Sequence, residues 1–331
     1  MTEAKFETPV LLMLFNRPEP TAQVAGRIRE LHPRRLFLAA DGPREDRPGE
    51  AELCRAARDA ALSAVDWQCE LTTRFLDRNL GCRNAVSSHL DWFFDAAEEG
   101  IILEDDCLPA PDFFRFAAAM LDRYRQYERV MHIAGANFQN GIRRGSGDWF
   151  FSRIPHIWGW ASWRRAWRHY DVTMRDLPER SRDPEFRARL PHGDFYRWQL
   201  ERLFRLTREG APGFDTWDCQ WHYALLAHDG IAANPNVNLV SNIGGSGAHE
   251  IDSAICGLPC GKLPAGELRP PADELLLRAF CSALGSEGDV LQESGVTLRT
   301  NADAEEFTWR RCYHPTWRSL LRYCADRLTG K

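Results

Sequence analysis

The sequence has no apolar stretch long enough to cross a membrane and no large excess of charge of one sign. The apolar run from Val10 to Phe15 is far shorter than the roughly 20 residues that a spanning helix needs. Residues 1–9 mix acidic and basic side chains and lack the apolar segment of a secretion signal. The 42 basic and 47 acidic residues give a net charge of −5, which argues against nucleic-acid binding driven by bulk charge. We therefore expect a cytoplasmic protein that does not bind nucleic acid.

Cysteine pairs and glycine-rich phosphate loops are also absent from the sequence. None of the 10 cysteines forms a CxxC pair, so a structural zinc site is not expected, and their scattered spacing favours reduced, buried thiols. There is no GxxxxGK[ST] loop, and the glycines at 244–247 lack the GxGxxG spacing. A nucleotide bound by this chain would therefore be held at its diphosphate by a metal ion and by side chains.

Apolar runs alternate with helical patterns along the first two thirds of the 331 residues. Strands are expected near 10–15, 36–40, 70–75, 101–103, 130–133 and 237–243, and helices near 21–31, 51–65, 85–97, 113–124, 195–206 and 218–226. Such alternation predicts an α/β protein with a doubly wound, mostly parallel sheet and helices on both faces. Ligands of these sheets bind beyond the carboxyl ends of the strands.

The stretch from Ile101 to Leu103 runs directly into three carboxylates, Glu104-Asp105-Asp106. Neighbouring like charges repel unless a cation or shared protons offset them, so the cluster indicates a divalent metal held by oxygen ligands, Mn²⁺ or Mg²⁺. We choose Asp106 as the direct ligand. The alternative is a solvated turn whose last acid caps the following helix.

The acidic triplet, with its neighbours, resembles the DxD-type motif of glycosyltransferases that have the GT-A fold. The resemblance is strongest to the N-acetylglucosaminyltransferases that initiate complex N-glycans and to their bacterial relatives, and it covers about the first 250 residues. It rests on Glu104-Asp105-Asp106, Pro109, Asp112-Phe113-Phe114, Asn16-Arg17-Pro18, Asp41-Gly42, Asn79-Leu80-Gly81, Gly159-Trp160 and Trp217-Asp218. It implies a GT-A domain over residues 1–265, with a nucleotide-binding half (1–108) and an acceptor-binding half (109–265). Prolines near 264–271 mark the start of a C-terminal helical extension, 266–331.

The resemblance also implies roles for single residues. Asp106 is expected to bind the metal and the donor diphosphate, Arg17 to approach the nucleotide, and Asp41 to accept a hydrogen bond from a uracil ring. The other expected donor-binding residues are Asn16, Asn79, Arg83, Glu104 and Asp105. Arg17 and Asp41 have ordinary alternatives, a loop ion pair and an Asp-Gly turn. His249 is a second metal candidate, with a surface histidine as its alternative.

Asp218 is the expected catalytic base, because it lies between Trp217 and Trp221 in a stretch that resembles the Trp-Asp-Asp-Trp sequence of the related enzymes. This chain departs from that pattern with one Asp and an extra residue. Asp215 is therefore a second choice for the base, and capping of the following helix is the alternative role for Asp218.

Five of the 12 tryptophans fall between residues 149 and 167. Trp160, Trp163 and Trp167 have helical spacing, which is typical of core residues on a helix. The loop part, Trp158-Gly159-Trp160, is expected to form a sugar-facing wall, because indole offers an apolar face and one donor. Residues 309–331 carry six basic side chains and one acid. This tail is either a helix docked on the domain or a peripheral contact with anionic lipid at the inner face of the membrane.

Together these features predict a metal-dependent, inverting glycosyltransferase that moves a sugar from a UDP-sugar donor to a hydroxyl of a glycan or lipid-linked acceptor. A sugar-phosphate nucleotidyltransferase would need a glycine-rich basic loop near the N-terminus, where this chain has Leu14-Phe15-Asn16-Arg17-Pro18. The remaining alternative is a non-catalytic protein that binds carbohydrate or nucleotide-sugar.

Overall fold

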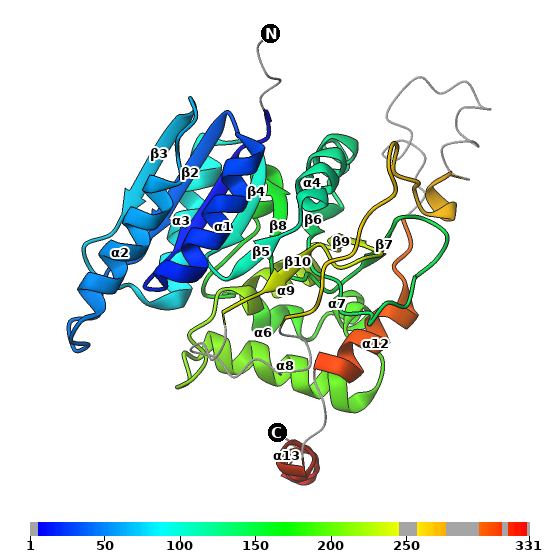
Figure 1. Ribbon diagram of the computed structural model, residues 1–331. Helices are drawn as coiled ribbons and strands as arrows, with labels where there is room; N and C mark the ends of the chain where they lie inside the picture. Colours follow the sequence, from blue (N-terminus) through cyan, green and yellow to red (C-terminus); the bar gives the residue numbers. More distant parts are fainter. Residues whose placement is uncertain (1–5, 245–256, 276–297, 313–316, 330–331) are drawn as a thin grey trace.

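The computed structural model describes residues 6–244, 257–275, 298–312 and 317–329, which form a central sheet between layers of helices (Figure 1). The strands are β1 (Val10–Leu14), β2 (Arg35–Ala40), β3 (Glu70–Phe75), β4 (Glu99–Glu104), β5 (Cys107–Pro109), β6 (Val130–Ala134), β7 (Trp149–Ser152), β8 (Trp160–Trp163), β9 (Ile231–Pro235) and β10 (Val240–Asn242). The helices are α1 (Pro18–Leu31), α2 (Glu50–Ser63), α3 (Gly81–Ala96), α4 (Pro111–Arg123), α5 (Arg164–Trp167), α6 (Leu177–Arg180), α7 (Pro184–Arg189), α8 (Asp194–Arg208), α9 (Asp218–Ala227), α12 (Ala302–Cys312) and α13 (Trp317–Thr329).

The main sheet has the strand order β3-β2-β1-β4-β8-β6-β9-β7, and β5 pairs with β10 in a separate ribbon. Strands β1 to β4 are parallel. Strand β8 lies antiparallel between β4 and β6, so β4 and β6 point the same way, and β9 is parallel to β6. The carboxyl ends of β1, β2, β4, β6 and β9 therefore lie along the same side of the sheet, together with the beginning of β8.

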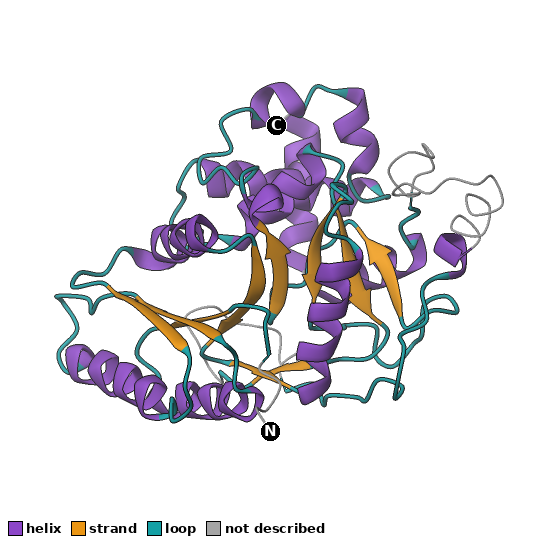
Figure 2. Cartoon of the chain, turned by 90° about the horizontal axis from the view of Figure 1, so that it is seen from above, coloured by secondary structure: helices purple, strands orange, loops and turns teal. Residues whose placement is uncertain are grey.

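Side chains of β1 alternate between two cores on opposite faces of the sheet. Val10, Leu12 and Leu14 pack in a core that includes α1, α2 and α4, whereas Leu11 and Met13 pack in a core that includes α3 and α9. Figure 2 shows the helices on both sides of the strands. The predicted doubly wound α/β architecture is confirmed.

Strands β7, β8 and β9 in the second half of the chain were not predicted. Trp160 and Trp163 lie on strand β8 and not on a helix, because the helix begins only at Arg164. The charged stretch 176–193 contains α6 and α7, whose Leu177 and Phe186 are buried in a third core.

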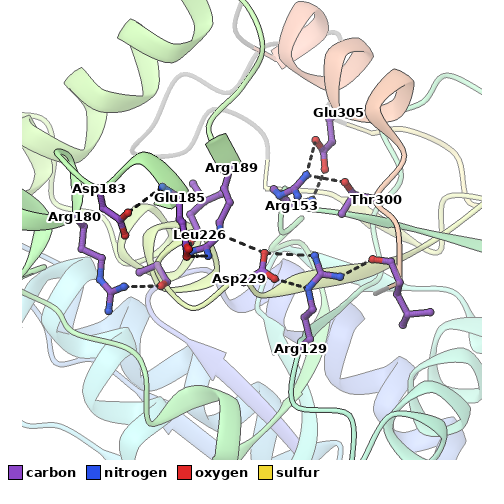
Figure 3. Close-up of polar contacts among 12 residues, drawn as sticks. Arg129, Arg153, Arg180, Asp183, Glu185, Arg189, Leu226, Asp229, Thr300 and Glu305 are labelled. Carbon is purple, nitrogen blue, oxygen red and sulfur yellow. Dashed lines mark hydrogen bonds and ion pairs between the residues drawn. The ribbon is translucent and has the colours of Figure 1, made fainter. Parts of the chain in front are cut away.

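The described parts of the C-terminal extension pack against the body of the protein. Leu268 and Leu298 belong to the same core as β1, and Glu274 is fully buried, accepting hydrogen bonds from Arg123 Nε (2.7 Å) and Tyr124 Oη (2.5 Å). Figure 3 shows Arg153 beside Thr300 and Glu305. Within its described parts, the extension is thus continuous with the domain that precedes it.

Helix α13 lies beside α8, where Trp198 donates to Asp326 at 3.2 Å and Tyr323 contacts the rings of Phe195 and Trp198. Among the residues that the structure describes, no helix is both long enough and apolar enough to span a membrane.

Candidate functional site

Arg17, just after the end of β1, bridges two residues of the acidic triplet, Asp105 and Asp106. Its Nη1 donates to Asp106 Oδ2 at 2.9 Å, and its Nη2 forms an ion pair with Asp105 Oδ1. Asp105 is 2% exposed, and its other oxygen accepts the backbone N–H of Phe15 at 3.1 Å. Burial raises the pKa of Asp105, and Arg17 opposes that shift. The carboxylates of Asp105 and Asp106 therefore have a counter-ion from the chain itself.

The start of the loop after β10 covers this ion pair. The N–H of Ile243 donates to the backbone oxygen of Asp106 at 2.8 Å. A Cβ added to Gly244 would lie 2.6 Å from Asp106 Oδ2 and 2.7 Å from Arg17 Nη1. A side chain at position 244 would therefore displace the guanidinium or the carboxylate from its present place.

Glu104 has no such counter-ion. Strand alternation directs it to the face of the sheet that carries α3 and α9, and its carboxylate has no hydrogen-bond or ion-pair partner in the described part of the chain. Burial, followed by the charges of Asp106 and Asp105, raises the pKa of Glu104 to about 8. Asp218 contributes to the same shift and Arg17 opposes it, so the base predicted on α9 lies near Glu104.

Asp218 is the first residue of α9 and is held by its neighbours. Thr216 Oγ1 donates to Asp218 Oδ1, and Tyr170 Oη donates to the backbone oxygen of Trp217 at 3.2 Å. Trp217 itself is 2% exposed and stacks on Trp160 with a centroid separation of 5.6 Å. The peptide that carries Asp218 is therefore fixed against the core.

Asp215, the second choice for the base, has a structural role. Its carboxylate accepts the N–H groups of Cys82 at 3.0 Å and Arg83 at 3.2 Å, which are the first unpaired amides of α3. Arg83, predicted to bind the donor, donates from Nη2 to the backbone oxygens of Thr207 (2.9 Å) and Phe214 (2.6 Å). Both residues fasten α3 to the segment before α9.

Asp41 and Asn79 are brought together, but they are bonded to each other. Asp41 accepts Asn79 Nδ2 at 2.9 Å, Leu80 N at 2.9 Å and Gly42 N at 2.8 Å, and it is 8% exposed. Burial raises its pKa, and the N–H groups of Leu80 and Gly42 oppose the rise. The carboxylate stabilises the turn at 79–81 and has few acceptor positions left for a uracil ring.

Asn16 also has a protein partner, since its Nδ2 donates to Glu50 Oε1 at 2.9 Å. Glu50 is 5% exposed and forms an ion pair with Arg44. Asn16 follows β1 as expected, but its amide is bonded to the first residue of α2.

The predicted tryptophan wall is wrong at Trp160. Trp160 is fully buried between His132, Trp217 and Trp221, so it cannot contact a sugar. Gly159 has a φ of +61°, and its oxygen accepts the N–H of Gly135 at 2.7 Å. Trp158 is only half-buried and contacts Phe138 edge-on, 5.1 Å between centroids. Of the three predicted wall residues, Trp158 alone is partly exposed.

Gly244, Thr216 and Tyr170 were not predicted from the sequence as parts of the site. Gly244 and Tyr170 act through contacts with residues far along the chain, which leaves no motif. Thr216 could have been found from its spacing to Asp218, because a Thr two residues before an Asp can reach its side chain.

A complete metal site formed by protein side chains alone is not present in the described ranges, where no three His, Cys, Asp or Glu side chains converge. Glu104 and Asp106 do offer two hard oxygen donors at one place, and the carboxylate of Glu104 lacks a counter-ion. Mg²⁺ is commonly bound by one or two carboxylates plus phosphate oxygens, so these residues fit a metal completed by a nucleotide. His249 lies outside the described residues.

No family model matches the chain, and no curated protein matches it. Among solved structures, the chain is similar to an apo UDP-glucose pyrophosphorylase at 11% identity and a TM-score of 0.34, over 71% of this chain and 93% of that one. It is also similar to a putative glucose-1-phosphate thymidylyltransferase from Bacillus anthracis, solved with sucrose, at 8% identity and a TM-score of 0.26, over 58% of this chain and 83% of that one. Both similarities are too low for either activity to be carried over to this chain.

Proposed function

We propose that this chain is a metal-dependent, inverting glycosyltransferase that transfers a sugar from a UDP-sugar to an acceptor hydroxyl. The observation that carries the proposal is that Glu104, at the end of β4, lies close enough to both Asp106 and Asp218, the first residue of α9, for its pKa to respond to their charges. Displacement at an anomeric carbon needs one anionic site for the cation of the donor diphosphate and another to take a proton.

Asp106 and Glu104 are the residues that would hold Mn²⁺ or Mg²⁺. The ion would supply Lewis acidity that stabilises charge on the leaving diphosphate. Arg17 lies at the same place and offers a fixed cationic fork, so its guanidinium is suited to the diphosphate oxygens once a divalent ion takes over Asp106. The choice of uridine rests on the resemblance of the acidic motif.

Asp218 is the proposed base. Thr216 donates to Oδ1 and thereby orients the carboxylate that would accept the proton of an acceptor hydroxyl. A base on the side of the sugar opposite the leaving group gives inversion at the anomeric carbon. The acceptor class is a glycan or a lipid-linked sugar, and basic residues 309–331 would place a lipid acceptor near anionic headgroups. Liposome co-sedimentation of the full chain and of a chain ending at residue 308 tests that contact, which equal binding would remove.

The proposal is tested by thermal shift and by turnover with a panel of nucleotide sugars. A UDP-sugar is expected to raise Tm only when Mn²⁺ is present, since a ligand that binds the native state stabilises it. Asp106→Asn should abolish this shift, whereas Asp95→Asn, on the exposed side of α3, should leave it intact. Asp218→Asn should keep the shift and lose turnover.

The alternative is a protein that binds a nucleotide sugar without transferring it. A metal-dependent shift with no hydrolysis of the donor and no transfer to any acceptor would favour this alternative. No shift with any nucleotide sugar would end both hypotheses.

A further inference from the structure

Strand β3 forms an uncovered edge of the main sheet. It pairs with β2 on one side, and Figure 1 shows it as the outermost strand. Its first four residues, Glu70 to Thr73, are exposed. The opposite edge strand, β7, is buried throughout, and Asn301 N donates to Phe151 O at 2.7 Å, so the C-terminal segment covers that edge. In the described part of the chain, nothing covers β3 in this way.

The hydrogen bonds to β2 show which backbone groups of β3 point outward. Glu70 N donates to Arg34 O at 2.8 Å, and Leu76 N donates to Ala40 O at 2.9 Å. Because the backbone alternates along a strand, the N–H and C=O groups of Leu71, Thr73 and Phe75 point away from the sheet. These groups are available to a further strand.

The side chains of β3 separate into an apolar and a charged face. Leu71 is 38% exposed and lies on the face that also carries Phe75. Arg58 of α2 lies over the Phe75 ring, 5.2 Å from its centroid, so Leu62, one turn further along α2 and 37% exposed, lies on the same flank of that helix. Glu70, Thr72 and Arg74 occupy the other face of β3. There Arg74 Nη1 donates to the backbone oxygen of Ser88 on α3, and Glu70 lies 3.6 Å from the guanidinium groups of Arg34 and Arg35.

We propose that two copies of this chain associate through their β3 strands, which pair antiparallel about a two-fold axis at Thr72. In this register Leu71 lies opposite Thr73 of the second copy, and their outward N–H and C=O groups form the hydrogen bonds. Glu70 lies opposite Arg74 of the second copy, and Arg74 opposite its Glu70. The edge is therefore self-complementary in charge, and exposed leucines gather on its other side.

The experiment is sedimentation velocity over a concentration series of the full chain. The wild type is expected to dimerise. Glu70→Arg places arginine opposite arginine at both symmetric positions, and Arg74→Glu places glutamate opposite glutamate. Each single variant should weaken dimerisation about tenfold or more, because like charges directly opposite one another destabilise a strand pair. Asp59→Arg, on the outward face of α2, makes the same charge change as Glu70→Arg and should leave the dimer unchanged.

Mixing the two single variants provides the sharpest result. A Glu70→Arg chain beside an Arg74→Glu chain has opposite charges at both positions, so the mixture should dimerise as the wild type does. A third variant, Thr73→Pro, removes an outward N–H without touching the bonds to β2 and should be monomeric. A wild type that stays monomeric overturns the proposal, as does a dimer that survives all three variants or a mixture that fails to associate. None of these outcomes depends on turnover.

Discussion

Replacement of Glu104 by Gln should stabilise the metal-free protein at alkaline pH. Burial and the neighbouring charges of Asp106 and Asp105 raise the pKa of Glu104 to about 8 in the folded state, against an ordinary value of 4.5. Between these values the folded state retains a proton that the unfolded chain releases. The free energy of unfolding therefore falls as pH rises through this window, and the penalty is complete above pH 8. Gln cannot ionise and avoids the penalty.

The size of this effect follows from the shift in pKa. Each pKa unit corresponds to about 1.4 kcal/mol. The free energy of unfolding of Glu104→Gln should therefore exceed that of the wild type by up to about 4 kcal/mol at pH 8 and by less than about 1 kcal/mol at pH 5. The figure at pH 8 is an upper limit, because protein relaxation and water penetration reduce the repulsion.

Urea denaturation in EDTA at the two pH values measures the difference. Glu99→Gln is the matched control, since Glu99 lies at the other end of β4 and is paired with Arg125 at 2.8 Å. The control should differ from the wild type by the same amount at both pH values. If the gain from Glu104→Gln were no larger at pH 8 than at pH 5, the electrostatic description of the acidic cluster would be refuted.

Three other predictions concern contacts that hold the fold together. Glu274→Ala leaves the Arg123 guanidinium, which is 23% exposed, without its carboxylate partner. The free energy of unfolding measured in urea should fall by about 3–5 kcal/mol. Equal stability would mean that residues 266–275 do not anchor the extension. Asp215→Ala should lower the free energy of unfolding by about 1 kcal/mol, because it removes the cap of α3, and Asp215→Asn should retain most of that stability. A loss of turnover without a loss of stability would instead make Asp215 the base. Burial lowers the pKa of His132 and His156 to about 3, so the unfolded state binds more protons than the folded state below pH 6.5. The free energy of unfolding should therefore fall by about 2 kcal/mol for each histidine between pH 7 and pH 5. A urea midpoint that stays constant over this range would contradict this prediction.

Strands β1, β2 and β4 of the parallel half of the sheet were predictable because they contain continuous apolar runs that end in turn or polar residues. The second half was not, since β7 to β9 are short strands whose conformation depends on their neighbours in the sheet. The spacing of Trp160, Trp163 and Trp167 matches a helix, yet the first two lie on β8 and only Trp167 on α5. β9 contains two alanines, an asparagine and a proline, which have low strand propensity, and it is strand only because it lies between β6 and β7.

The positions of the site residues were easier to predict than their partners. The ends of β1, β2 and β4 follow from the apolar pattern, and Arg17, Asp41 and Glu104 lie at those ends. Their hydrogen bonds depend on loops that approach from elsewhere in the sequence. Asp41 and Asn79 are 38 residues apart, and nothing in either segment shows that each satisfies the other.

The clustering of three acids indicated a cation, and the structure contains one in the guanidinium of Arg17, 89 residues before Asp106. Strand alternation separates the acids, since Glu104 faces α3 and α9 while Asp105 turns back to Arg17 and Phe15. Arg17 compensates Asp105 and Asp106 but leaves Glu104 with a raised pKa. Glu104 is thus the member of the triplet whose charge is least compensated. A further cation would stabilise the cluster most by binding between Glu104 and Asp106.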